Sequence, residues 1–285
     1  MLDRKPNVLR VFPRKTRATP IDDYSIVGWP SLFFPKDFSE IHISIAFSWD
    51  LPFAFRLKKA WESIAPTKVG GPATGMRGDE FIPGMYLRPG YVITSRGCPN
   101  KCWFCEAWKR DGDVRELPIT DGWNLLDDNL LACSEDHIHA VFEMLKRQPR
   151  RAEFTGGLES TRLKDWHIDL LAALKPKQIF FSYDSDSQYE SLVIAGQKLI
   201  KAGFTTNSHT LRCYVLVGFP EDSFERAENR LVRASKAGFL PMAMLFRHPD
   251  ETPVDKTWRK FQRQWARPIL TSQIIKELDK CPTSS

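Results

Sequence analysis

From residue 91 to residue 246, short apolar segments alternate with longer segments of helical periodicity. The apolar segments are rich in β-branched and aromatic residues and are typical of strands. We expect six of them, at residues 91–95, 123–131, 152–155, 178–183, 211–217 and 240–246. Strands that alternate with helices indicate a parallel sheet with right-handed crossovers. The sequence therefore predicts an α/β fold, a partial (β/α)6 barrel of the TIM type.

Helix boundaries between these strands are marked by capping residues. Residues 134–137 read Ser-Glu-Asp-His, an N-cap serine followed by acids that favour a helix start. Further helices are expected at 163–174, 189–202 and 223–237. Gly203 and Gly238 follow the last two, where a C-cap glycine commonly ends a helix.

Residues 1–90 read as a small α/β appendage. The pattern predicts strands at 7–12 and 41–47, a helix at 51–64, and a short strand and turn at 68–72. Strand, helix and strand form a βαβ unit. The pair Gly70-Gly71 is more typical of a turn than of a phosphate cradle. We therefore expect three parts: the appendage at 1–90, the barrel at 91–250 and a helical tail at 251–285.

The tail carries aromatic and basic residues together. Trp258, Phe261 and Trp265 fall on one helical face, and basic residues surround them: Arg259, Lys260, Arg263 and Arg267. An apolar stripe that docks on the barrel with a solvated basic rim is the favoured interpretation. A nucleic-acid contact, which also uses basic and aromatic residues, is the alternative.

Three cysteines lie in one short loop, Gly97-Cys98-Pro99-Asn100-Lys101-Cys102-Trp103-Phe104-Cys105. Soft thiolates at the spacing C-x3-C-x2-C can hold three irons of a [4Fe–4S] cube and leave the fourth iron open. Structural zinc normally takes four ligands, often as two pairs. The nearest further candidates, Cys133 and His137, have no paired spacing. The loop therefore favours an iron–sulfur cluster over zinc or a disulfide.

The remaining cysteines, Cys133, Cys213 and Cys281, are scattered as expected of free thiols in a reducing compartment. No run reaches the ~18 apolar residues of a membrane span, and the first residues have no secretion-signal pattern. We expect a cytoplasmic protein with no membrane partner. The net charge of +6 weakly favours an anionic substrate. Neither a nucleophile elbow nor a P-loop is present, so acyl and phosphoryl transfer are disfavoured.

The cysteine loop resembles the signature of radical S-adenosylmethionine (SAM) enzymes, C-x3-C followed by x-aromatic-C, with Phe104 as the aromatic residue. The resemblance implies that Cys98, Cys102 and Cys105 hold the cluster and that its open iron binds SAM. It implies reductive cleavage of SAM to a 5′-deoxyadenosyl radical, which abstracts hydrogen from a substrate. It also implies an electron donor such as flavodoxin or ferredoxin.

Two expected strand ends resemble the family's contacts to the SAM amino group. Asp128 lies in a polar triplet, 127–129, where the family often has an acidic or glycine-rich segment. Gly156 and Gly157 resemble the family's G-G-E segment, although one residue separates them from Glu159. The glycines also fall on the third expected strand rather than the second. Either the second strand is misassigned, or the triplet contacts SAM and the glycines face the substrate.

The remaining strand ends supply the other expected SAM contacts. Ser182 and Asp184 lie at the strand end where the family has a contact to the SAM ribose or carboxylate. Asp186 or Ser187 is expected to cap the helix that follows. Gly218 partly matches the family's adenine-binding segment. Arg247 is a candidate partner for the SAM carboxylate or for an anionic substrate, and a surface arginine is the equal alternative.

The appendage resembles a shortened form of the Rossmann-like domain that precedes the barrel in cobalamin-binding radical SAM enzymes and their methylthiotransferase-like relatives. It has no D-x-H-x-x-G motif, so cobalamin is not expected. The first ninety residues hold no cysteine, which disfavours tRNA methylthiolation with a second cluster. The competing hypothesis is a non-enzymatic module that binds zinc through the cysteine loop or nucleic acid through the basic tail. The sequence identifies neither the substrate nor the reaction outcome.

Overall fold

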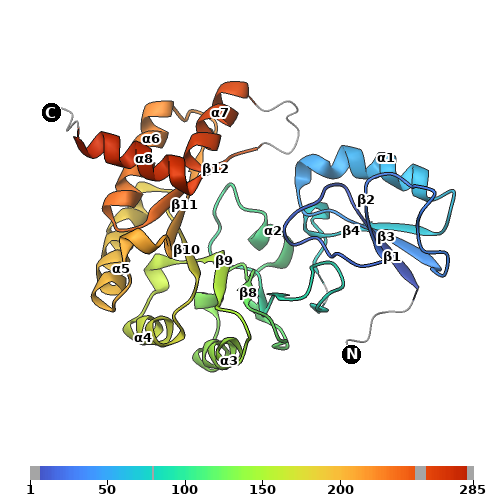
Figure 1. Ribbon diagram of the computed structural model, residues 1–285, viewed down its shortest axis with the longest axis horizontal. Coiled ribbons are helices and arrows are strands. Elements are labelled where there is room, and N and C mark those ends of the chain that lie inside the picture. Colours follow the sequence, from blue (N-terminus) through green and yellow to red (C-terminus); the bar gives the residue numbers. More distant parts are fainter. Residues whose placement is uncertain (1–6, 79, 248–254, 281–285) are drawn as a thin grey trace. The chain divides into compact units, whose positions relative to one another are not determined.

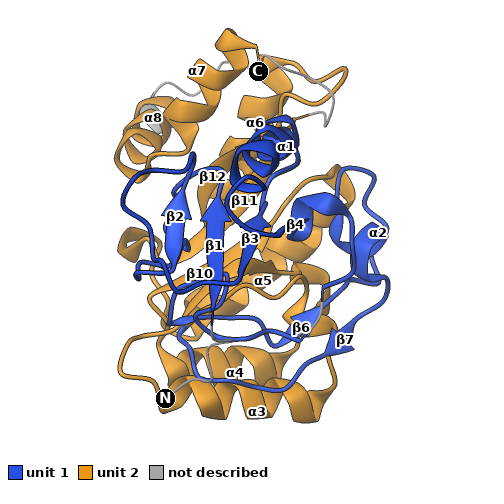
Figure 2. Cartoon of the chain, turned by 90° about the vertical axis from the view of Figure 1, so that its right-hand side faces the viewer, with its two compact units in different colours: residues 1–123 blue, residues 124–285 orange. Residues whose placement is uncertain are grey.

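The computed structural model describes residues 7–78, 80–247 and 255–280. The chain divides into two compact units, residues 1–123 and 124–285 (Figure 2). Both units contain parallel strands connected through helices, so the predicted α/β class is confirmed. None of the helices in these ranges is long and apolar enough to cross a membrane. Cys281 lies outside the described residues.

The first unit contains a parallel sheet in the order β2-β1-β3-β4 (Figure 1). Its strands are β1 (Val8–Phe12), β2 (Ser25–Val27), β3 (Glu40–Ser44) and β4 (Thr67–Gly70), and α1 (Leu51–Trp61) connects β3 to β4. Leu57 and Trp61 of α1 pack with Ile41 and Ile43 in a fully buried core. The βαβ pattern predicted from the sequence is confirmed, whereas β2 was missed because it has only three residues.

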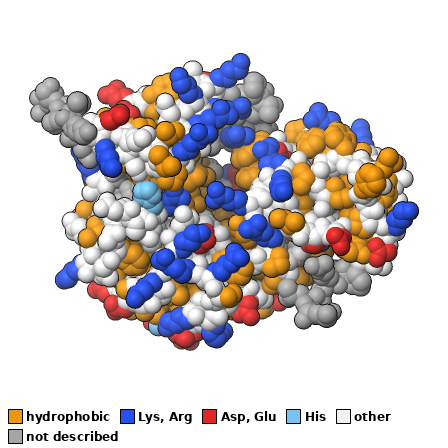
Figure 3. Space-filling model, in the orientation of Figure 1, with side chains coloured by type: hydrophobic (Ala, Val, Ile, Leu, Met, Phe, Trp, Pro, Cys, Tyr) orange, Lys and Arg blue, Asp and Glu red, His pale blue; other side chains and the backbone are white. Residues whose placement is uncertain are grey.

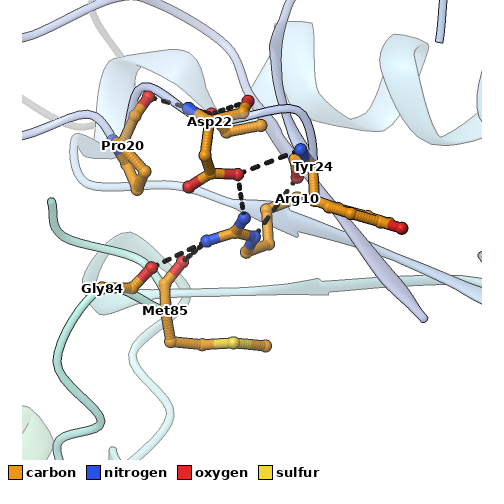
Figure 4. Close-up of polar contacts among 7 residues, drawn as sticks. Arg10, Pro20, Asp22, Tyr24, Gly84 and Met85 are labelled. Atoms are coloured by element: carbon orange, nitrogen blue, oxygen red, sulfur yellow. Dashed lines mark hydrogen bonds and ion pairs between the residues drawn. The ribbon is translucent and has the colours of Figure 1, made fainter. Parts of the chain in front are cut away.

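Arg10 on β1 holds a distant segment against this sheet (Figure 4). Its guanidinium is 3% exposed and pairs with Asp22. It also donates to the carbonyls of Gly84 at 2.8 Å, Met85 at 2.7 Å and Tyr24 at 3.2 Å. Each of the three guanidinium nitrogens therefore has at least one acceptor, which lowers the cost of burying the charge.

The rest of the first unit has short elements: β5 (Tyr91–Val92), β6 (Ser95–Arg96), α2 (Ala107–Asp111) and β7 (Arg115–Glu116). The strand expected at 91–95 is wrong in extent. It divides in two, because Ser95 and Arg96 pair antiparallel with β7. Gly97 follows with φ of +83°, and an added Cβ would lie 2.3 Å from the carbonyl oxygen of Asp113. Only glycine fits this close approach.

The second unit contains strands β8 (Asn124–Leu125), β9 (Glu153–Leu158), β10 (Gln178–Ser182), β11 (Leu211–Val217) and β12 (Leu240–Leu245). They pair in parallel in the order β12-β11-β10-β9-β8. Successive strands are connected through α3 (Glu135–Lys146), α4 (Asp165–Leu174), α5 (Tyr189–Lys201) and α6 (Phe224–Lys236) (Figure 1). The predicted alternation of strands and helices is confirmed here.

The predicted helix caps are largely found. The predicted N-cap Ser134 accepts from the His137 amide at 3.2 Å. Ser223, expected only as the first residue of its helix, also acts as an N-cap and accepts from the Arg226 amide at 3.2 Å. Gly203 and Gly238 end α5 and α6 with φ of +97° and +94°. The strand expected at 123–131 is wrong in extent, since β8 ends at Leu125 and residues 130–132 form a 3-10 turn.

The tail forms two helices, α7 (Lys256–Trp265) and α8 (Pro268–Lys280). The predicted aromatic stripe packs inward on α6. Phe224 lies 4.2 Å from Trp258 and 5.5 Å from Phe261 between ring centroids, and Trp265 is 1% exposed. The Gln262 amide also donates to the carbonyl of Ala243 on β12 at 3.3 Å. The predicted docking of the tail through its apolar face is therefore confirmed.

Candidate functional site

The cysteine loop lies between β6 and α2 in the first unit and is anchored by its own backbone. The Cys98 amide donates to the carbonyl of Gly112 at 3.0 Å, which joins the start of the loop to the end of α2. The Cys105 amide donates to the carbonyl of Cys102 at 3.1 Å and closes a turn around the last two cysteines. The Trp108 indole donates to the same carbonyl at 2.9 Å. Both ends of the loop are thus fixed.

The donor set of this loop fits an iron–sulfur cluster chemically. Cys98, Cys102 and Cys105 are half-buried in one loop, and cysteine thiolates are the ligands such clusters take. Within residues 7–78, 80–247 and 255–280, however, the side chains are not grouped so that three or more His, Cys, Asp or Glu could hold a metal ion. The thiols would have to reorient on the anchored backbone to bind one.

Aromatic side chains accompany the cysteines. Phe104 is half-buried, and its ring meets Trp103 edge to face with 5.5 Å between centroids. Trp103 is 57% exposed. The aromatic residue before the third cysteine is therefore partly covered by an exposed indole.

The expected strand-end residues other than the cysteines and Phe104 belong to the second unit. Because its strands are parallel, their carboxyl ends share one edge of the sheet. Asp128, Gly156, Gly157, Ser182, Asp184, Gly218 and Arg247 all lie at or just after these ends. Five successive strand ends thus bring them to one edge.

The triplet 127–129 follows β8 as a loop and is bound to the end of β9. Asp127 is 2% exposed and Asn129 4%, while Asp128 between them is half-buried. The Asn129 amide donates to a Glu159 carboxylate oxygen at 2.7 Å. Arg162 donates to the same carboxylate at 2.8 Å, and the Thr161 hydroxyl also donates to it. Glu159 therefore has a structural role, joining neighbouring strand ends.

Gly156 and Gly157 form an irregularity at the end of β9. Phe154 pairs with Ile179 and Leu158 with Phe181, so β9 has two more residues than β10 between these pairs. An added Cβ on Gly156 would lie 2.3 Å from the carbonyl oxygen of Asp127. Gly157 has φ of +97° and its nearest such contact is 3.9 Å. A side chain at position 156 would clash with the backbone of Asp127. At position 157 there is room for a side chain, but the positive φ favours glycine.

Asp184 follows β10 and is embedded in the strand ends. Its carboxylate accepts from the Leu216 amide at 3.0 Å, and its own amide donates to the Gln188 side chain at 2.8 Å. Burial raises the pKa of Asp184 to about 6, against the opposing effects of the Leu216 hydrogen bond and the Arg230 charge. A carboxyl group that titrates near neutral pH at a strand end is a candidate functional group. Ser182, the last residue of β10, is half-buried nearby.

The residue that caps the helix after Asp184 is not one of the two expected from the sequence. Neither Asp186 nor Ser187 caps the helix; Ser185 is the N-cap of a 3-10 turn at Asp186–Gln188, which leads directly into α5. The Gln188 side chain accepts from the Ser185 amide at 3.2 Å. A glutamine three residues after a serine is the signature of a capping box, and this signal was available in the sequence.

Gly218 follows β11 with φ of +72°. An added Cβ would lie 2.8 Å from Leu245 and 3.0 Å from Trp258 of α7, so packing with the tail explains the glycine. Its amide donates to Asp222 at 2.8 Å, and Arg230 of α6 donates to the same carboxylate at 2.8 Å. Arg247 is half-buried two residues after β12.

Arg230 was missed by sequence reasoning. It also donates to the carbonyl of Leu216 at 3.0 Å, and its guanidinium lies 5.0 Å from the centroid of the Phe219 ring. Arg230 thereby connects the end of β11 to α6. In the sequence, Arg230 lies next to the apolar Leu231 on a helix with many other charged residues. This position does not distinguish it from solvent-exposed arginines of the same helix.

A cavity of about 390 Å³ lies beside α6 in the second unit. Charged and polar side chains line it: Asp186, Ser223, Glu225, Arg226, Asn229, Arg230 and Arg233. Arg233 pairs with Asp186 at 2.6 Å and lies 4.0 Å from the centroid of the Tyr189 ring. None of the seven is a residue that the sequence predicted as a SAM contact.

Comparison with known proteins adds no relative. No protein-family model matches the chain, and no curated protein matches it with significant similarity.

Proposed function

We propose that this chain is a radical SAM enzyme that binds a [4Fe–4S] cluster through Cys98, Cys102 and Cys105. The observation that carries the proposal is the anchored loop with three half-buried cysteines at the spacing C-x3-C-x2-C. Three protein ligands leave one iron of a cubane open for a small molecule. In the proposal, the three cysteine side chains turn toward a common cluster on this anchored backbone.

A reduced cluster would supply the electron that cleaves SAM to methionine and a 5′-deoxyadenosyl radical, which abstracts hydrogen from the substrate. In the proposal, the second unit binds and orients SAM. Asp128, Gly156 and Gly157 contact its amino group or face the substrate. Ser182 and Asp184 accept hydrogen bonds from the ribose, Gly218 lies along adenine and Arg247 pairs with a carboxylate. Phe104 packs beside the cysteines.

The parallel strands with alternating helices support a partial (β/α)6 barrel as the scaffold, since ligands in such folds bind at the carboxyl ends of strands. Asp184 is the strongest strand-end candidate. Burial keeps its pKa near 6, so at neutral pH it is largely a carboxylate that accepts hydrogen bonds from a diol. The proposal includes a cytoplasmic location, a flavodoxin or ferredoxin as electron donor and an anionic substrate. It does not include cobalamin.

The competing zinc-binding module makes a different prediction for the same loop. Zinc in a structural site takes four ligands, so a fourth residue such as Cys133 or His137 would have to join the three thiolates. Cys133 is half-buried after a 3-10 turn, and His137 is buried on α3.

Metal and sulfide analysis of anaerobically purified, reconstituted protein separates the two. We expect about four irons and four sulfides per chain, lost when Cys98, Cys102 and Cys105 are all replaced by alanine. Cys133→Ala is the matched control and should retain the cluster. One zinc per chain without iron, lost also in Cys133→Ala, would contradict the proposal. Adding SAM should shift the electron paramagnetic resonance spectrum of the reduced cluster.

A further inference from the structure

The outward face of α7 carries a row of cations. Lys256, Lys260 and Arg263 lie on α7, and Arg267 follows just after its end; all four are exposed. Their spacing of four, three and four residues places them on one helical stripe. Figure 3 shows Lys and Arg side chains gathered over this region.

The row is not neutralised by the described part of its helix. Residues 256–265 include four basic residues and no acidic residue. Asp255, the N-cap, accepts from the Thr257 amide at 2.7 Å and from its hydroxyl at 2.6 Å. No ion pair is found for Lys256, Lys260, Arg263 or Arg267 within the described ranges. Unpaired cations in a row attract a polyanion.

We propose that this face of α7 binds the phosphate backbone of a nucleic acid. The inference does not depend on the cysteine loop. Three cations on α7 span about 10 Å at 1.5 Å per residue, which matches about three phosphates at 3.4 Å per nucleotide. Arg267 extends the row by about one turn.

The chemistry of the other face disfavours a membrane. A basic helix that lies on lipid inserts its apolar face between the acyl chains. On α7 that face packs against the protein: Trp258 and Phe261 are half-buried and contact Phe224, and Trp265 is 1% exposed. An acidic protein would be expected to add an aromatic or apolar anchor at the centre of its contact. The row itself has none.

Salt dependence of binding provides a sharp test. The affinity of the full-length protein for a fluorescent 20-nucleotide oligouridylate is measured by anisotropy between 50 and 200 mM KCl. Four phosphate contacts on a single strand predict a log–log slope of about −2.8, a ~50-fold loss of affinity over this range. The double variant Lys260→Gln, Arg263→Gln should have a slope of about −1.4, a ~7-fold loss. Both positions are exposed, so folding should be unchanged.

A matched control removes the same charge elsewhere. Lys201→Gln, Lys236→Gln also deletes two exposed cations of the second unit and should retain the slope of the unmodified protein. The proposal is overturned if the α7 and control variants show the same slope, or if the unmodified protein does not bind the oligonucleotide. It is also overturned if polyglutamate competes as well as the oligonucleotide at equal charge. Equal, α7-dependent binding to phosphatidylserine vesicles would overturn it as well.

Discussion

Asp184 gives the most quantitative prediction, because its burial links stability to pH. Its pKa is raised from 3.8 to about 6 in the folded protein, so between these values the folded state binds more protons than the unfolded state. The free energy of unfolding must then fall as pH rises through this range. At 1.36 kcal/mol per pKa unit, the full effect is about 3 kcal/mol. About 1.4 kcal/mol of it lies between pH 5 and pH 7.5.

Asp184→Asn removes the titration and retains an oxygen acceptor for the Leu216 amide. Between pH 5 and pH 7.5, we expect the free energy of unfolding of the variant to rise by about 1.4 kcal/mol relative to that of the unmodified protein. Urea denaturation followed by tryptophan fluorescence measures this difference, with both proteins compared in each buffer. Asp186→Asn serves as a control, since its side chain is 79% exposed. A stability difference for Asp184→Asn that is constant with pH would refute the reasoning.

Three further substitutions test the packing described above. Arg10→Met should destabilise the first unit by about 3–5 kcal/mol in urea denaturation, since the half-buried Asp22 carboxylate loses its cation and the carbonyls lose their donor; a loss below 1 kcal/mol would contradict this. Gly156→Ala should cost at least about 1–3 kcal/mol because its Cβ meets backbone. Gly70→Ala, where the glycine likewise has no positive φ but no neighbour lies within 4 Å, should cost less by the same assay. Trp265→Ala should lower the stability of the second unit by about 3–5 kcal/mol, and an unchanged unfolding midpoint would show that α7 is not docked.

The fold class was readable from the sequence because the second unit follows simple periodicity. Residues 178–183 and 211–217 were expected as strands and form β10 (Gln178–Ser182) and β11 (Leu211–Val217) almost unchanged. Both are runs of β-branched and aromatic residues, which suit a sheet covered on both faces. Ser134 was equally readable, since an N-cap hydroxyl acts within three residues of the chain.

The elements that failed depend on contacts that are distant in sequence. The strand expected at 123–131 ends early, because Asp127 packs its backbone on Gly156 and Asn129 binds Glu159. The apolar residues after the triplet are buried in a 3-10 turn instead. Periodicity alone does not distinguish these two ways of burying leucines.

The sequence predicted where the candidate site residues lie, but not which residues they contact. Strand ends could be listed, because parallel topology places them on one edge. The roles of Arg230 and Glu159 could not, since each depends on partners from other elements. The same holds for the packing of Gly156 against Asp127 and of Gly218 against Trp258, which the sequence did not show.

The most direct test of the account is SAM cleavage by the reconstituted protein. Under anaerobic conditions, with dithionite as the electron source, we expect 5′-deoxyadenosine to form from SAM and to be detectable by mass spectrometry. The variant with Cys98, Cys102 and Cys105 all replaced by alanine should form none, while Cys213→Ala should form it as the unmodified protein does. No 5′-deoxyadenosine from protein with a full complement of iron and sulfide, or equal amounts from the triple variant, would contradict the central claim.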